Sequence, residues 1–204
     1  MEKKIKEFNI VVVGTGGQGL ITLLGILSEA AYLEGYDLRT SELHGLAQRG
    51  GSVEVHITFG EKVFSPLMNQ GEENLIIALE AQEVLKACCY ACPIGSPEAP
   101  QTTFLINDFF IPIPGAKPKS LSEVKEELKK FCQKTIIVPA AEICQKELGT
   151  NVLSGIYLLS LAVFQNIIPL KPDSILKAIE RNIPEEFLEL NRKTFHLAEK
   201  HAKA

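Results

Sequence analysis

The chain has 204 residues, of which 46% are hydrophobic and 23% charged, so it is long enough to bury a full core as one globular unit. Its formal net charge of −4 and the lack of a Lys/Arg cluster give no reason to expect nucleic acid as a partner. The apolar run near the N-terminus is too short for a signal peptide, and no stretch approaches the roughly 18 apolar residues of a membrane span, so we expect a cytoplasmic protein without membrane contact.

The first third of the chain predicts a strand–helix–strand unit. Residues 8–13 form a short β-branched run, typical of a buried strand, and Gly14 ends it. Residues 20–33 are apolar on nearly every helical face, which predicts a helix buried on more than one side. Residues 36–41 predict a second strand, which we expect to be parallel to the first and joined to it by a right-handed crossover.

The next segment predicts a strand and a hairpin. Residues 52–59 alternate between apolar and polar side chains, as in a strand that is half exposed on one face. Residues 60–62 have the composition of a hairpin turn, with the returning strand through Val63 and Phe64. We expect further strands at 74–79, 102–107 and 134–139.

Helices follow most of these strands. Ser120 and Glu123 have the spacing of a capping box, which predicts the start of a helix over 120–132. The other expected helices cover 81–87, 140–148, 152–164, 173–181 (capped by Asp173 or Ser174) and 185–200 (after Pro184). The order predicts an α/β fold over 1–204, as one domain: an open, mostly parallel, Rossmann-like sheet with helices on both faces and a helical C-terminal part from about residue 150.

Five cysteines stand at positions 88, 89, 92, 132 and 144. An odd number without a secretion signal argues against a disulfide framework. Cys89 and Cys92 have CxxC spacing, but there is no second CxxC and no ferredoxin-like run of cysteines. We therefore favour reduced thiols over a metal or redox site, and we expect no metal bound by this chain.

Residues 14–19, GTGGQG, follow the first expected strand and precede its helix. In that position backbone N–H groups and the positive end of the helix converge, which suits a phosphate or carboxylate. The GxGxxG pattern alone is weak, because glycines are also needed for a tight turn and for close packing of helix on sheet.

A second glycine-containing polar loop, residues 42–51, follows the second expected strand. Ligands bind at the carboxyl ends of strands in such sheets, so we expect the two loops to lie side by side at one edge and to share a site. Arg49 could instead be a solvated surface arginine and His44 a structural histidine. We expect His56 to face solvent, and we assign no role to His196 or His201, whose spacing is poor for sharing a metal.

The two loops together resemble the gamma-type subunit of 2-oxoacid:ferredoxin oxidoreductases. The resemblance rests on GTGGQG at 14–19 and SELHGLAQRGGSV at 41–53, and it extends through FG at 59–60 and SPL at 65–67 to NVLxG at 151–155 and ELN at 189–191. The form HGxAQRGGSV, followed by His56, is most similar to the beta subunits of indolepyruvate oxidoreductases. Residues 88–100 depart from the family pattern, so the resemblance gives no role to the cysteines there.

The resemblance implies a subunit of an enzyme that uses thiamine diphosphate, iron–sulfur clusters and coenzyme A to convert a 2-oxoacid to an acyl-CoA, with ferredoxin as electron acceptor. The chain lacks both the GDG…N pattern typical of thiamine diphosphate sites and a cluster-binding cysteine run, so it cannot be the whole enzyme. A larger subunit that holds those cofactors is the implied partner, and this chain alone is expected to be inactive. The expected contact residues are Gly14, Gly16, Gly17, Gln18, Gly19, Glu42, His44, Gln48, Arg49, Gly50 and Gly51; catalytic residues are not assigned.

Two alternatives remain open. In a stand-alone nucleotide-binding Rossmann enzyme, Gly14, Gly16 and Gly19 would surround a pyrophosphate and Glu42 would bind the ribose; the QRGG sequence at 48–51 would then have no function. In a purely structural assembly module, the loops would contact only the partner subunit. The sequence does not distinguish a coenzyme A contact from a partner contact.

Overall fold

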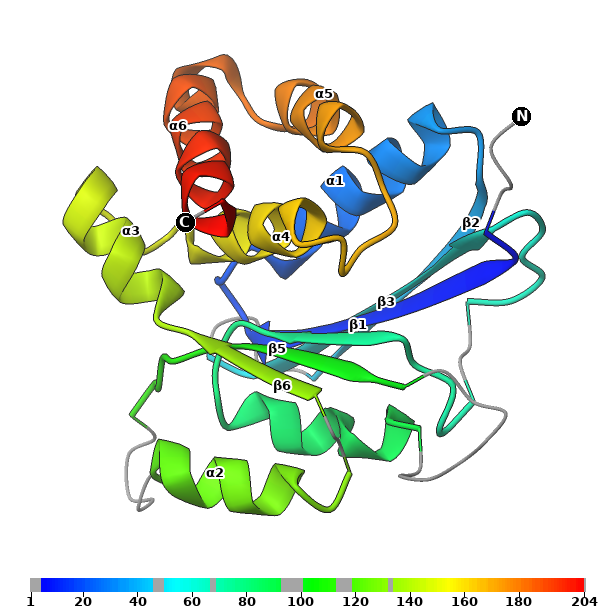
Figure 1. Cartoon of the computed structure of the whole chain (residues 1–204), viewed down its shortest axis with the longest axis vertical. Coiled ribbons are helices and arrows are strands. Elements are labelled where there is room, and N and C mark those ends of the chain that lie inside the picture. Colours follow the sequence, from blue (N-terminus) through cyan, green and yellow to red (C-terminus); the bar gives the residue numbers. More distant parts are fainter. Residues whose placement is uncertain are drawn as a thin grey trace.

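A computed structural model describes residues 5–45, 50–66, 69–92, 101–112, 119–131 and 134–203. Within these residues six strands form one twisted sheet with helices on both faces (Figure 1). The spatial order is β2-β3-β1-β4-β5-β6. The strands are β1 (Glu7–Thr15), β2 (Asp37–His44), β3 (Ser52–Gly60), β4 (Leu75–Ala78), β5 (Thr103–Asn107) and β6 (Lys134–Val138).

The sheet is mixed but mostly parallel. The pairs β1–β4, β4–β5 and β5–β6 are parallel, whereas β3 is antiparallel to both of its neighbours, β1 and β2. The predicted α/β fold is therefore confirmed. Residues 10–13 at the centre are all at most 2% exposed, because helices cover both faces of a strand in this position.

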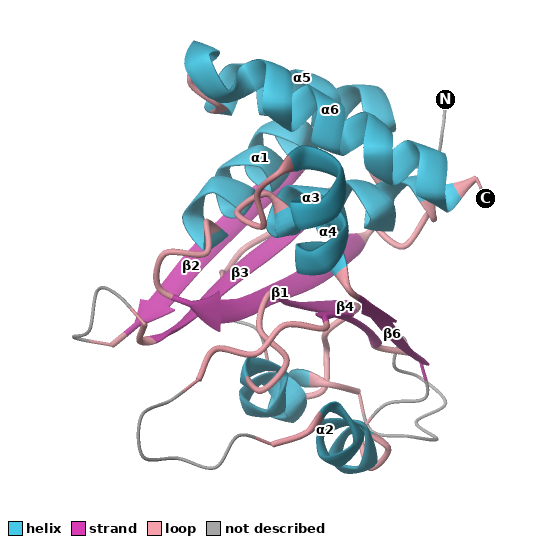
Figure 2. Cartoon of the chain, turned by 90° about the vertical axis from the view of Figure 1, so that its left-hand side faces the viewer, coloured by secondary structure: helices cyan, strands magenta, loops and turns pink. Residues whose placement is uncertain are grey.

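Successive β1 side chains enter two different cores. Ile10 and Val12 pack toward the larger cluster, and Val11 and Val13 toward the smaller one on the opposite face. The larger cluster contains residues of α1 (Leu20–Leu33), α3 (Ala140–Leu148), α4 (Ser154–Phe164), α5 (Pro172–Asn182) and α6 (Glu185–Ala202). Figure 2 shows these helices on one side of the sheet, with α2 (Leu121–Leu128) on the other side; the 3-10 helix η1 (Glu83–Tyr90) contributes to the same smaller core as α2.

The bounds expected for α1 and α3 are confirmed, and so is the Ser120–Glu123 capping box. Other details were wrong. The helix expected at 81–87 is η1, over 83–90, and α2 ends at Leu128. Helix α5 begins at Pro172 after Lys171, without a side-chain cap from Asp173 or Ser174, because proline at the first helical position is already preorganised.

The largest correction concerns β3. The expected hairpin at 60–62 does not form, and β3 instead lies between β1 and β2. Strands β1 and β2 thus run in the same direction but are not neighbours. The alternation in 52–59 does not mark a half-exposed strand, because His56 and Thr58 on its polar face are each only 4% exposed. A polar face can be buried when other groups supply its hydrogen bonds, which periodicity does not reveal.

Among the described residues, none of the helices combines the length and apolar character that crossing a bilayer requires.

Gly60 provides a test of the β1–β3 ladder. It pairs with Glu7 on one side and Asp37 on the other, and a Cβ added there would lie 2.3 Å from the Lys6 carbonyl oxygen. Because backbone cannot yield as a flexible side chain can, Gly60→Ala should lower the free energy of unfolding in urea by about 1–3 kcal/mol. Gly45→Ala, where a Cβ meets nothing within 4 Å, is the matched control and should be nearly neutral. Equal stability of the two variants would contradict this packing.

Candidate functional site

The turn between β1 and α1 has the geometry expected from the glycines. Gly17 and Gly19 have φ values of +100° and +81°, which side chains rarely tolerate. Gly19 is the N-cap of α1, and the first turn of that helix has no side-chain cap and no acidic residue. Within the described chain the amides of Gly17 and Gly19 donate to no protein acceptor. The positive end of α1 is therefore open toward a ligand.

Gln18 holds this turn closed. Its Oε1 accepts a hydrogen bond from the Thr15 amide at 2.8 Å, and its Nε2 donates to the Leu79 carbonyl oxygen at 3.4 Å. A Cβ at Gly14 would lie 2.6 Å from Gln18 Oε1, so Gly14 leaves the space that the glutamine side chain occupies. Gly14 and the side-chain amide of Gln18 thus have structural functions in the free chain. For Gly14 this agrees with the alternative explanation of the GxGxxG pattern, in which the glycines serve a tight turn and close packing.

The two glycine loops meet directly. The Gly16 amide donates to the Gly51 carbonyl oxygen at 2.8 Å, and the Gly50 amide donates to the Gly16 carbonyl oxygen at 3.3 Å. The predicted adjacency of the loops is confirmed. The strands next to the loops, β1 and β3, pair antiparallel, whereas we expected the loops to meet at the edge of a parallel sheet. The Gly16 N–H is consumed by this pairing, so it is not available to a ligand.

A cavity of about 480 Å³ lies beside the paired loops. Glu42 and His44 of β2 line it together with the glycine turn; the complete lining is Gly16, Gly17, Gly19, Leu20, Ile21, Glu42, His44, Gly45 and Val53. Thr15 Oγ1, at the base of the turn, is buried and has no hydrogen-bond partner within the described chain. Gln48 and Arg49, also predicted site residues, lie outside the described residues.

The cavity combines backbone donors with one carboxylate and one imidazole. Donors at the α1 N-terminus favour an anionic or strongly polar ligand group. The Glu42 carboxylate repels an anionic group next to it and instead accepts hydrogen bonds from hydroxyl or amide donors. The arrangement suits a ligand with both phosphate and neutral hydrogen-bonding parts.

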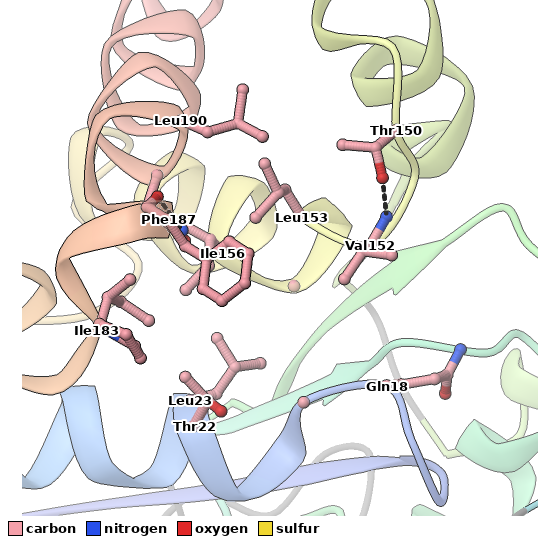
Figure 3. Close-up of a pocket in the computed structure, with 14 residues that line it drawn as sticks. Gln18, Thr22, Leu23, Thr150, Val152, Leu153, Ile156, Ile183, Phe187 and Leu190 are labelled. Carbon is pink, nitrogen blue, oxygen red and sulfur yellow. Dashed lines mark hydrogen bonds between the residues drawn. The ribbon is translucent and has the colours of Figure 1, made fainter.

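A second cavity, of about 590 Å³, is lined in part by Gln18 and Gly19 (Figure 3). Apart from these two residues and the start of α1, its walls come from residues 150–156 and 183–191. The resemblance included NVLxG at 151–155 and ELN at 189–191 but gave them no role, and no sequence pattern indicated that the two segments enclose a cavity.

His56 lies in a buried polar cluster on the opposite face of the sheet, so the expectation that it faces solvent was wrong. Its Nε2 is 2.6 Å from Glu54 Oε1, and the Tyr90 hydroxyl donates to the same oxygen at 2.8 Å. Burial disfavours the charge of Glu54, but its hydrogen bonds with His56 and Tyr90 outweigh that effect and hold its pKa below the usual value. His201 bonds to the buried Tyr157 hydroxyl at 2.7 Å, an interaction between α4 and α6.

The four cysteines within the described residues do not gather into a ligand set. Cys88 and Cys92 are buried and donate to the carbonyl oxygens of Val84 and Gly71, and Cys89 is exposed. Over the described part of the chain no three His, Cys, Asp or Glu side chains are placed to hold a metal ion.

Comparison with known proteins gives matches over almost the whole chain. Residues 9–200 match the family model described as pyruvate ferredoxin/flavodoxin oxidoreductase. The chain is 34% identical to indolepyruvate oxidoreductase subunit IorB of Archaeoglobus fulgidus, over 94% of this chain and 93% of that protein. It is 29% identical to the protein of the same name from Pyrococcus horikoshii, over 98% of each chain.

Solved structures show the same fold. The gamma subunit of a keto/oxoacid ferredoxin oxidoreductase from Geobacter sulfurreducens matches with a TM-score of 0.66, 19% identity and 97% of each chain covered. A 2-oxoglutarate:ferredoxin oxidoreductase from Magnetococcus marinus, with 2-oxoglutarate, coenzyme A and succinyl-CoA bound, matches with a TM-score of 0.69 and 17% identity. That match covers 99% of this chain and 32% of the other, so the fold occurs there as one part of a longer chain.

The cluster around Glu54 predicts a pH-dependent stability through Glu73. Glu73 is 0% exposed, and its carboxyl oxygens have no partner within the described residues. Burial, together with the charges of Glu54 and Glu72, raises its pKa from 4.5 to about 8. The folded state therefore holds a proton that the unfolded state releases, and stability should fall as pH rises from about 4.5 to 8, by about 1.4 kcal/mol per pH unit at most.

Glu73→Gln should flatten this dependence of the unfolding free energy, measured by denaturant titration at a series of pH values, whereas substitution of its exposed neighbour, Glu72→Gln, should leave most of it. A wild-type profile without a decline in this window would show that Glu73 is ionised when folded.

Proposed function

Since the chain belongs to the pyruvate ferredoxin/flavodoxin oxidoreductase family, we propose that it is the non-thiamine subunit of an arylpyruvate-specific, indolepyruvate-type 2-oxoacid:ferredoxin oxidoreductase. The observation that carries this proposal is the similarity to IorB subunits over nearly the full length of both chains. The complex would convert the 2-oxoacid to an acyl-CoA and pass the electrons to ferredoxin. The chain would act only within that complex.

The larger partner subunit would hold thiamine diphosphate and the iron–sulfur clusters, which supply the decarboxylation and electron-transfer chemistry. In this chain the described cysteines bond to backbone carbonyl oxygens or lie exposed, a donor set that does not fit a cluster. No step of the reaction is therefore assigned to a cofactor held by this chain. Its contribution would be to position a substrate and to complete the active site.

The glycine-loop cavity is the proposed contact for coenzyme A at the junction with the larger subunit. The amides of Gly17 and Gly19, which donate to no acceptor within the described chain, fit a phosphate. Glu42 and His44 would contact the neutral hydroxyl or amide parts of the ligand. Gly50 and Gly51 support the turn, and Gln48 and Arg49 remain proposed contacts on the sequence alone.

The position of Glu42 speaks against a stand-alone dinucleotide enzyme. In such folds the acidic residue that binds the ribose ends a strand adjacent to the first one. Here β3 separates β2 from β1, and the Gly16 amide is already used by Gly51. A purely structural role in assembly stays as the second candidate, because exposed apolar side chains such as Val152 and Phe187 also suit a partner contact.

Reconstitution tests the proposal. The chain should be co-expressed with a thiamine-diphosphate-binding large subunit of this family from the same genome and purified through a tag on the larger subunit. The complex should reduce a viologen dye only when both an arylpyruvate and coenzyme A are present, and neither subunit alone should do so. The isolated chain should carry no cluster absorbance and no thiamine diphosphate. A brown isolated chain, or a complex indifferent to arylpyruvates, would contradict the proposal.

Arg49 tests the site within that complex. A guanidinium is suited to phosphate or carboxylate, and losing a charge-assisted hydrogen bond of this kind should lower kcat/KM for coenzyme A by about ten- to hundredfold in Arg49→Ala. The free energy of unfolding of the chain should change by less than about 0.5 kcal/mol. Arg39→Ala, on the exposed edge of β2, is the matched control and should keep the rate. Loss of the larger subunit from purified Arg49→Ala would instead favour the assembly role.

A further inference from the structure

The carbonyl oxygen of Leu79, directly after β4, accepts hydrogen bonds from two side-chain amides. Gln18 Nε2 donates to it at 3.4 Å, and Asn107 Nδ2 donates to it at 3.1 Å. The Leu79 amide donates in turn to the Val13 carbonyl oxygen at 2.9 Å, which ties Leu79 to β1. This one carbonyl group therefore connects Gln18, in the glycine turn, with Asn107, the last residue of β5.

The orientation of both side-chain amides is determined by their other partners. Asn107 Oδ1 accepts a hydrogen bond from the Ala141 amide at 3.1 Å, and Gln18 Oε1 accepts one from the Thr15 amide at 2.8 Å. A backbone N–H only donates and a carbonyl oxygen only accepts, so the NH2 group of each side chain must face Leu79. Rotation of either amide by 180° would oppose like groups at both of its ends.

Asn107 acts on the turn without reaching a ligand. It is 0% exposed, so a bound molecule cannot touch it. Its partner Ala141, at the start of α3, lines a small cavity of about 180 Å³ together with Gly17 and Gln18, so this end of α3 lies beside the glycine turn. Hydrogen bonds have preferred distances and directions, and those of Asn107 therefore fix the Leu79 carbonyl oxygen to which Gln18 bonds.

The glycine turn requires such an anchor. Gly17 and Gly19 flank Gln18 directly, and both have positive φ values. Because glycine populates a wide range of backbone conformations, these two residues do little to hold the turn in one of them. The contacts of the Gln18 side chain with Thr15 and Leu79 restrict the turn instead.

We infer that Asn107 is a positioning residue for the glycine-loop site. Through the Leu79 carbonyl group and Gln18, it holds the turn in the conformation that presents the amides of Gly17 and Gly19 to a ligand. The inference rests on the proposed function, in which those amides bind a phosphate of coenzyme A. It adds a buried residue, distant in sequence from both glycine loops, to the groups that determine the geometry of the site.

A role of Asn107 only in capping α3 would have a different consequence, because its loss would then lower stability and leave the turn unchanged. Thr102, directly before β5 and 2% exposed, is a matched control. Its hydroxyl accepts from the Cys92 amide at 2.8 Å and donates to the Glu73 carbonyl oxygen at 2.7 Å. Asn107→Leu and Thr102→Val each remove a buried polar group with two backbone partners from one end of β5, at nearly constant shape.

Nuclear magnetic resonance relaxation of the isolated, 15N-labelled chain tests the inference. The order parameters of the Gly17 and Gly19 amides should be about 0.85 in the wild type and should fall below about 0.6 in Asn107→Leu. The Thr15 amide, which bonds to Gln18, should exchange with solvent about tenfold faster or more. Thr102→Val should keep the wild-type values. If Asn107→Leu does not fold, Asn107→Ala removes the same amide without adding bulk.

A double variant tests whether Asn107 acts through Gln18. Gln18→Met alone should disorder the turn, and adding Asn107→Leu to it should cause no further loss of order, because the connection is already broken. Additive losses would overturn the connection through Leu79. Unchanged order in Asn107→Leu, or an equal loss in Thr102→Val, would overturn the positioning role, whatever the activity of the complex.

Kinetics of the reconstituted complex separate this inference from the proposed function. Asn107→Leu should raise KM for coenzyme A about tenfold or more and change KM for the arylpyruvate by less than about twofold, because only the phosphate contact is misplaced. Loss of order in the turn with an unchanged KM for coenzyme A would support the positioning of the turn and would overturn the assignment of coenzyme A to this cavity.

Discussion

The antiparallel ladder between β1 and β3 positions both the glycine loops and helix α1. It runs without interruption from Glu7 opposite Gly60 to Thr15 opposite Ser52. Because Thr15 and Ser52 are the last pair, the two glycine loops leave the sheet at the same point, and Gly16 pairs with Gly50 and Gly51. A shift of one residue in the pairing register of β3 against β1 would exchange the two faces of β3 and would place its polar side chains in the larger core.

The ladder also separates two environments on β3. Val55, Ile57 and Phe59 join the core under α1, whereas Glu54 and His56 face the side of η1. The apolar face holds α1 against the sheet and so places the helix N-terminus over the glycine loops. The polar face forms a buried cluster next to Glu73, whose pKa is raised first by burial and then by the charges of Glu54 and Glu72. Stability and site geometry therefore depend on opposite faces of one strand.

The two cavities beside the α1 N-terminus differ in chemistry although they share Gly19. One is lined by backbone amides, Glu42 and His44, and the other by uncharged, mostly apolar side chains. Of the two, Gln18 lines only the apolar cavity, and its side-chain amide is engaged by Thr15 and Leu79. The N-terminus of α1 therefore contributes to one polar and one apolar environment.

The sequence by itself determined the strand–glycine–helix unit, the bounds of α1 and α3, the capping box at Ser120 and the mostly parallel α/β class, because periodicity and glycine positions are local signals. It also indicated that the loops at 14–19 and 42–51 meet. Only the tertiary structure decided that β3 lies between β1 and β2, that His56 is buried, and that residues 150–156 and 183–191 enclose a cavity. These features arise from pairing and packing between distant segments, whose energies no local pattern records.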